Sequence, residues 1–178
     1  MAVSQTMYPR VVRGFAIRVL ALCWGVCMLA GPAAAGDFSL LINGKAIHLD
    51  SAPGVTYNER NWGAGLQYEF DPVDDGRWVP FLSASGFLDS NENPSYYAGG
   101  GAMRRYPVGP AAWNTHFDLG VIAFLMTREN FHDGDPFFGA LPVASFGTRR
   151  VALNMTYIPK VDPKMVPILF FQIKVGMF

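Results

Sequence analysis

Few side chains in this 178-residue sequence could act as a general base, because it contains only three histidines, His48, His116 and His132. The strand pattern puts His48 at the same rim of a predicted sheet as the pair Asp89-Ser90. A hydroxyl, an imidazole and a carboxylate at one rim could support acyl transfer, with the imidazole taking a proton and the carboxylate orienting or stabilising it. The same residues are also common in turns, so these types alone leave a structural role open. His132 is a rival base on that rim, whereas His116 falls at the opposite end.

Other kinds of catalytic chemistry find no support in the sequence. No His, Cys or carboxylate cluster has metal-ligand spacing, and no Gly-x-Ser-x-Gly, Walker or dinucleotide motif is found. We therefore predict no metal and no cofactor. Both cysteines, Cys23 and Cys27, lie in the first 35 residues, so the remainder has neither a thiol nucleophile nor a disulfide.

The first 35 residues have the pattern of a cleavable secretory signal. Three arginines precede an apolar run of about a dozen residues, and small residues follow it. That run is shorter than the roughly 20 residues that a membrane-spanning helix needs. We expect residues 36–178 to form a single domain. The signal holds three of the 14 basic residues and none of the 14 acidic ones, so this domain is net acidic, which argues against nucleic acid as a partner.

A strict alternation of side chains indicates the fold of this domain. From Trp62 to Phe70 the even positions are all apolar, while the odd positions hold two glycines, Gln67 and Glu69. Such a strand suits one lipid-facing side and one lumen-facing side. The acidic Glu69, between two aromatic residues, requires a polar interior on its side of the strand.

Eight segments of strand character can be placed along the chain, and eight is an allowed number for a membrane barrel. They cover about 38–49, 62–70, 78–88, 95–106, 115–128, 137–147, 149–157 and 167–178. The sequence thus predicts an all-β, eight-stranded antiparallel transmembrane barrel. The inward face of the fifth segment carries Ile122, Phe124 and Met126 as well as polar residues, so we expect a partly apolar lumen. A soluble eight-stranded barrel or sandwich that binds a small ligand is the structural alternative.

Several short pieces of sequence, in a fixed order, match a known family. They are Tyr57-Asn58-Glu59-Arg60 with Trp62-Gly63, Asp89-Ser90 with Ala98-Gly99 and Gly101, Leu119-Gly120, Thr127-Arg128, Leu141-Pro142 with Ala144-Ser145 and Gly147, and Met155-Thr156-Tyr157-Ile158-Pro159. In these pieces the chain resembles the outer-membrane lipid A palmitoyltransferases, the PagP family. The resemblance implies a monomeric enzyme of the Gram-negative outer membrane that moves a palmitoyl or similar chain from a phospholipid donor to lipid A, without a cofactor.

The resemblance also implies roles for individual residues. The catalytic residues of the family correspond to His48, Asp89 and Ser90, although the gap from His48 to the Tyr57 motif is shorter than usual. The glycine that forms the floor of the acyl pocket corresponds to Gly101. The sequence leaves open whether the serine is acylated or positions the acceptor.

Two prolines of the family open a lateral gate for lipids, and they correspond to Pro142 and Pro159. The physical reason is that proline lacks an N–H group and leaves a hydrogen bond of the sheet unmade. A third proline of the family is Asn61 here, so a second gap between strands is expected to be closed or reshaped. The amphipathic helix that precedes the first strand in better-known members is also absent from the pattern.

Four polar residues at the predicted outer rim are candidates for contacts with lipid headgroups: Asn58, Glu59, Arg60 and Arg128. Two further functions use the same barrel. A lipid A deacylase or phospholipase would transfer the acyl group to water, and a non-catalytic lipid-binding barrel would keep the motif as scaffold only.

Overall fold

A computed structural model describes residues 36–50, 57–129, 131, 134–161 and 166–177. The expected secretory signal, residues 1–35, and the rival base His132 lie outside these residues. Within the described part of the chain, no helix is both long and apolar enough to cross a membrane.

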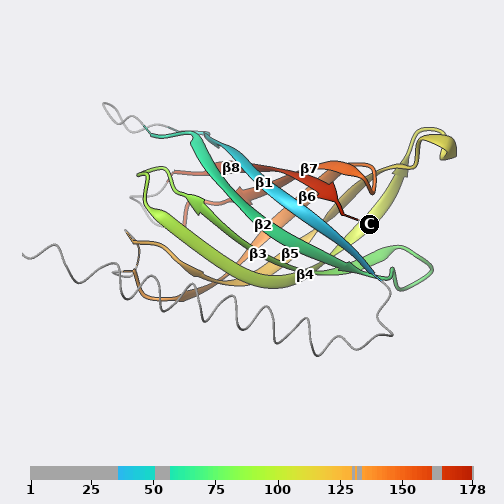
Figure 1. Ribbon diagram of the computed structural model, residues 1–178, viewed down its shortest axis with the longest axis horizontal. Coiled ribbons are helices and arrows are strands. Elements are labelled where there is room, and N and C mark those ends of the chain that lie inside the picture. Colours follow the sequence, from blue (N-terminus) through green and yellow to red (C-terminus); the bar gives the residue numbers. More distant parts are fainter. Residues whose placement is uncertain (1–35, 51–56, 130, 132–133, 162–165, 178) are drawn as a thin grey trace, which may run out of the picture. The chain divides into compact units, whose positions relative to one another are not determined.

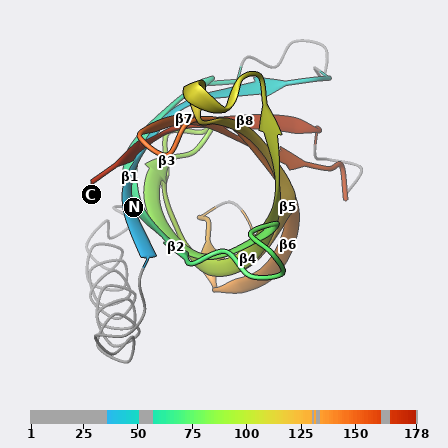
Figure 2. The same ribbon diagram turned by 90° about the vertical axis from the view of Figure 1, so that its right-hand side faces the viewer.

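Eight antiparallel strands form one closed barrel in which each strand pairs with its neighbours in sequence and β8 pairs with β1 (Figures 1 and 2). The strands are β1 (Gly36–His48), β2 (Arg60–Phe70), β3 (Trp78–Leu88), β4 (Pro94–Val108), β5 (Thr115–Thr127), β6 (Phe137–Gly147), β7 (Val151–Ile158) and β8 (Ile168–Gly176), with a short 3-10 helix η1 (Ala111–Trp113) between β4 and β5. The predicted fold class is confirmed. The strand starts differ from the expected ones by at most two residues. β7 begins two residues later than expected, at Val151, because Thr148 Oγ1 accepts the backbone N–H groups of Arg150 and Val151, each at 3.2 Å, in a tight turn.

The two faces of the strands differ in the way that the alternation predicts. On β2, Trp62 and Leu66 are exposed on the outside, whereas Gln67 and Glu69 are buried in the lumen. Exposed apolar side chains lie on the outside of every strand, for example Leu119 on β5 and Leu153 on β7. On β4 the large ones, Tyr106 and Val108, lie only near the end of the strand. A continuous apolar outer surface is what lipid contact requires of such a barrel.

The connections divide the barrel into two ends. We call the end with the β1–β2, β3–β4, β5–β6 and β7–β8 connections the outer end, and the opposite end, with η1 and the β6–β7 turn, the inner end. His48 lies at the outer end and His116 at the inner end, as the sequence predicts.

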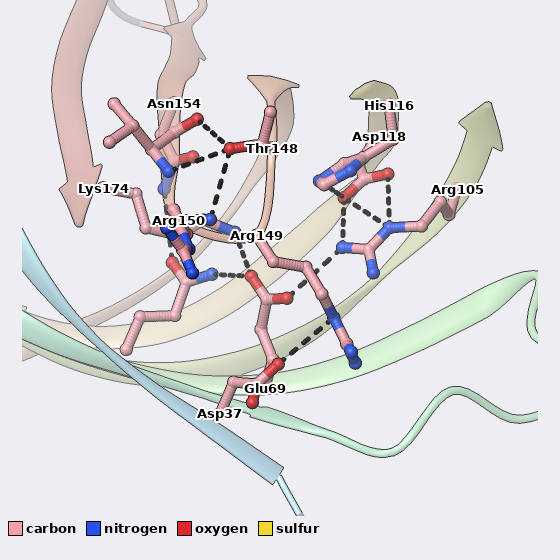
Figure 3. A network of polar contacts seen from close by, with 12 residues as sticks. Asp37, Glu69, Arg105, His116, Asp118, Thr148, Arg149, Arg150, Asn154 and Lys174 are labelled. Carbon is pink, nitrogen blue, oxygen red and sulfur yellow. Dashed lines mark hydrogen bonds and ion pairs between the residues drawn. The ribbon is translucent and has the colours of Figure 1, made fainter. Parts of the chain in front are cut away.

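Charged side chains fill the inner half of the lumen (Figure 3). Lys174 on β8 contacts Glu69 on β2, and both side chains are buried. Arg105 on β4 donates to both oxygens of Asp118, at 2.8 Å for the shortest contact, and also reaches Glu69 at 3.3 Å. His116 Nε2 lies 3.5 Å from Asp118 Oδ2. The two carboxylates are thus matched by two cations, which is the condition for holding charges in a low-dielectric interior.

The strand ladders are not equally complete at the outer end. Between β6 and β7 the pairs run only from Gly147–Ala152 to Val143–Thr156, so residues 137–142 of β6 have no partner on that side. On their other side, the same residues pair with β5 up to Phe137. An unpaired segment of six residues is roughly 20 Å of open strand edge.

Candidate active site at the outer rim

The structure brings Ser90 and His48 into direct contact at the outer rim. His48 is the last residue of β1, and Ser90 lies in the β3–β4 turn. Ser90 Oγ and His48 Nε2 are 3.1 Å apart. This is the contact through which an imidazole can remove the proton of a serine hydroxyl. The juxtaposition follows from two strands that are 42 residues apart in sequence ending at the same rim.

Asp89 organises the turn that carries Ser90. Its Oδ1 accepts the backbone N–H groups of Asn91 at 2.8 Å and Asn93 at 3.0 Å, and its Oδ2 accepts Arg128 Nε at 3.0 Å. The contacts of the described residues do not include one between this carboxylate and His48. The geometry therefore gives Asp89 a role in positioning the serine turn and Arg128. The sequence did not indicate the ion pair between Asp89 and Arg128. Asp89 follows β3 and Arg128 follows β5, so the two strands are not direct neighbours in the sheet, because β4 lies between them.

His48 is held by its surroundings as well as by Ser90. Its ring stacks on Tyr57 with a centroid distance of 4.3 Å and an interplanar angle of 12°. His48 Nδ1 is buried without a hydrogen-bond partner among the described residues. The loop that carries Tyr57 is tied to the serine turn, because Asn58 N donates to the Ser90 carbonyl oxygen at 3.1 Å. Tyr57 was not predicted from the sequence as a site residue. Its position directly before Asn58, a predicted headgroup residue, could have indicated it.

An apolar pocket opens beneath the Ser90–His48 pair and occupies the outer half of the lumen. It holds about 700 Å³ of empty space, part of it open to solvent. The polar residues Asn61, Asp89, Ser90 and Arg128 line its mouth. Aromatic and aliphatic side chains form most of the remaining wall: Ala46, Phe87, Tyr97, Ile122, Phe124, Met126, Leu141, Ile158, Ile168 and Phe170, with Thr156 and Gln172. The expectation of a partly apolar lumen is confirmed by Ile122, Phe124 and Met126. A pocket of this kind suits an apolar chain whose polar end stays at the rim.

Residues beside the open seam between β6 and β7 line this pocket. Leu141 and Ile158 line the pocket, and Pro142 and Pro159 stand on either side of the unpaired stretch, one in β6 and one just after β7. Proline cannot donate to a ladder, so these positions favour an unpaired edge.

The β1–β2 seam is closed, in agreement with the substitution of Asn61 for proline. The ladder continues to Lys45–Arg60, and Ala46 N donates to the Glu59 carbonyl oxygen at 3.0 Å. Asn61 itself is buried, and its Nδ2 donates to the Leu88 carbonyl oxygen at 2.7 Å, which joins β2 to β3.

Three of the predicted headgroup residues lie on one loop at the rim. Asn58 uses its side chain within the loop, since its Oδ1 accepts Arg60 N at 2.9 Å. Glu59 lies 3.5 Å from Lys45 in an exposed ion pair, and Arg60 is exposed. No group of three or more His, Cys, Asp and Glu side chains within the described ranges could hold a metal ion.

Comparisons with known proteins match these features. Residues 47–173 match the family described as "Antimicrobial peptide resistance and lipid A acylation protein PagP". The chain is 36% identical over 104 residues to "Lipid A acyltransferase PagP" of Bordetella pertussis, covering 58% of this chain and 54% of that protein. The protein of the same description from Methylobacillus flagellatus is 29% identical over 146 residues, covering 79% and 76%. The chain thus spans about half the length of the first of these relatives.

Among solved structures, the crystal structure of Ail, the attachment invasion locus protein of Yersinia pestis, is similar with a TM-score of 0.43 and 11% identity, over 80% of this chain and 97% of that one.

Proposed function

The chain belongs to the PagP family, and from this premise we propose that it transfers a long acyl chain from a phospholipid to lipid A in the outer leaflet of the outer membrane. The observation that carries the proposal is the 3.1 Å contact between Ser90 Oγ and His48 Nε2 above an apolar pocket. The contact supplies the chemistry, and the pocket supplies the binding. Each buried methylene contributes about 0.8 kcal/mol, so a long chain is held mainly by its length.

The rim residues support an ester exchange that balances without a cofactor. His48 Nε2 takes a proton from the attacking hydroxyl, either that of Ser90 or that of lipid A held by Ser90. The hydroxyl oxygen bonds to the ester carbonyl carbon of the donor, and the bond from that carbon to the glycerol oxygen breaks. The glycerol oxygen then leaves with the proton from His48. If Ser90 is acylated first, lipid A repeats the same exchange on the acyl-serine.

The surroundings of the pair support precise positioning. Asp89, held by turn amides and by Arg128, fixes the turn of Ser90, while Tyr57 fixes the imidazole ring. The donor chain enters through the seam between Pro142 and Pro159, and its headgroup stays at the rim, where Arg128 lines the pocket mouth. A monomer suffices for this mechanism, because every residue invoked comes from one barrel.

Mass spectrometry of lipid A tests the proposal directly. The full chain is expressed in an outer-membrane host that lacks its own palmitoyltransferase, beside Ser90→Ala and His48→Ala. We expect lipid A to gain the mass of one acyl chain with the wild type and neither variant to produce this gain. Tyr106→Ala, a change on the exposed outer face of β4, should retain it.

Other outcomes would favour the alternative functions. Folded wild-type barrel that leaves lipid A unchanged would refute the transfer to this acceptor. Loss of an acyl chain from lipid A, or release of free fatty acid from phospholipid, would indicate a deacylase or phospholipase. Unchanged lipids with all variants would leave a lipid-binding barrel.

A further inference from the structure

We infer that a hydrogen-bonded partition formed by Tyr97 and Gln172, and not the glycine at position 101, ends the acyl pocket and sets the length of chain that the barrel accepts. The inference rests on the proposed function only in taking the ligand to be an acyl chain. It names the residues that determine specificity at the bottom of the pocket.

Two cavities lie one behind the other in the lumen, and a few side chains belong to both. The outer cavity is the apolar pocket under Ser90. The inner one holds about 320 Å³ of empty space and is lined in part by polar side chains, Gln67, Ser83 and Asn154. Tyr97, Gln172, Ile122 and Thr156 line both cavities. Of these four, Tyr97 and Gln172 are hydrogen-bonded to each other at the boundary between the apolar and the polar space.

Hydrogen bonds hold these two side chains across the lumen. Gln172 Nε2 lies 3.3 Å from Tyr97 Oη and 2.7 Å from Asn43 Oδ1. Tyr97 Oη also lies 3.2 Å from Ser83 Oγ, and Asn43 Nδ2 donates to Ser85 Oγ at 2.8 Å. The partition thus ties β4 and β8 to β1 and β3. A chain that pushed past it would leave these buried groups without hydrogen-bond partners, which is unfavourable.

Gly101 lies closer to the inner end of β4 than Tyr97 does. It is four residues further along the strand, roughly 13 Å measured along the tilted strand. Its cross-strand partners are Phe81 and Ile122, both buried in the lumen, and Ile122 lines both cavities whereas Phe81 lines only the inner one. A Cβ atom at position 101 would meet the Val121 carbonyl oxygen and, at 2.9 Å, Phe81 Cζ, so backbone and phenyl ring already occupy the space that the glycine leaves. Gly101 is absent from the described lining of the outer pocket.

The inference predicts different results for two truncations in the lumen. Tyr97→Ala joins the two cavities, so longer chains gain burial, by up to about fourfold in affinity for each added methylene, which corresponds to ~0.8 kcal/mol. Phe81→Ala enlarges the inner space and leaves the partition in place, so it should not change the preferred length. Tyr106→Ala is the matched control, because it makes the same substitution on the exposed outer face of β4, away from both cavities and from the β6–β7 seam.

Binding and transfer are both measured. Purified barrels, held in a sterol-based detergent too bulky for the lumen, are titrated with lysophosphatidylcholines of increasing chain length, and complexes are quantified by native mass spectrometry. We expect wild-type affinity to rise with length and then level off. The levelling point should move to longer chains for Tyr97→Ala, with a parallel change in the chain found on lipid A, and stay unchanged for Phe81→Ala and Tyr106→Ala.

The opposite pattern would overturn the inference. A shift with Phe81→Ala and none with Tyr97→Ala would place the stop at the level of Gly101. If Tyr97→Ala fails to fold, as judged by heat-modifiable mobility on gels, Gln172→Ala removes the other half of the partition and must give the same shift. Wild-type binding that levels off at one length, without any transfer to lipid A, would refute the proposed function while supporting the partition. Binding with no dependence on length would refute the partition.

Discussion

The two halves of one lumen have opposite contents. The outer half is a largely apolar pocket that contains empty space and has polar groups at its mouth and at its bottom. The inner half is packed with charged side chains, and Lys174, Glu69, Arg105 and Asp118 neutralise one another there. The same strands supply both halves, and Ile122 and Asp118 are only four residues apart on β5.

The contrast shows how one barrel separates binding from stability. The inner network joins β2, β4, β5 and β8 across the lumen, and so it can fix the barrel shape without help from the outer half. The outer half then remains free to hold a ligand. Variants in the inner half should therefore change the unfolding free energy, and variants in the outer half should change activity.

Bridging the open β6–β7 seam beside the outer half of the lumen should have the largest effect on transfer activity. Cysteines at Pro142 and Tyr157, which would face each other if the β6–β7 ladder continued, can be bridged with a short bis-methanethiosulfonate reagent. Because residues 36–178 contain no cysteine, the reagent reacts only there. The bridge should abolish nearly all transfer of labelled acyl chains to lipid A, since lipids could no longer pass the seam, and a reductant should restore it.

The control for this closure places the same bridge where the ladder is already intact. Ala98 and Leu125 are paired across β4 and β5, so linking them should leave transfer unchanged. Full activity of the bridged Pro142 and Tyr157 pair would show that lipids enter by another route.

Removing one cation from the charged network of the inner half should have the next largest effect, and this effect should be on stability alone. Lys174→Met leaves Glu69 with one cation fewer in a buried site, and the unfolding free energy should fall by about 3–5 kcal/mol. Urea unfolding in lipid vesicles measures this change. Adding Glu69→Gln should recover part of the loss, because the unmatched charge is then removed. A large fall in activity of folded Lys174→Met barrel would contradict the division between the two halves.

The smallest effects are expected from two ion pairs that involve arginine, and these two pairs should differ in their effect on transfer. Arg128 and Asp89 lie at the mouth of the pocket, 3.0 Å apart, and the Asp89 side chain is only 3% exposed. Arg128→Met should reduce transfer by up to about 10²-fold, because the serine turn shifts from its position. Arg77 and Asp74 form an exposed pair at 3.3 Å, so Arg77→Met should leave transfer unchanged and alter stability by at most about 1 kcal/mol. Steady-state rates and unfolding curves of both variants test this difference.

The sequence predicted the strands well, since the alternation of side chains is a local property. It also placed His48 and Ser90 at one rim, because both follow from where β1 and β3 end. Contacts between side chains across the lumen could not be predicted from the sequence in the same way. The partners of Asp89, Tyr57 and Tyr97 depend on the tilt and stagger of the strands around the barrel, which no single segment reveals.

Gly101 illustrates the limit of motif-based reasoning in this chain. The glycine occupies the position that the resemblance implies, and it faces the lumen in register with Phe81 and Ile122. Whether it ends the pocket depends on the side chains around it, and here Phe81 fills the nearby space. Matching a residue to a motif fixes its place on the strand but not the shape of the cavity around it.

The open edge of β6 gives the barrel a front and a back. Among the described strands, the longest stretch without ladder pairs lies on β6 beside β7, and under the proposed function lipids approach the pocket sideways from this one sector of the surrounding bilayer. The encounter rate then depends on how the barrel is rotated about its own axis. A neighbouring membrane protein packed against β6 and β7 would block the encounter of the barrel with lipids, whereas the same neighbour packed against β2 and β3 would leave it unaffected.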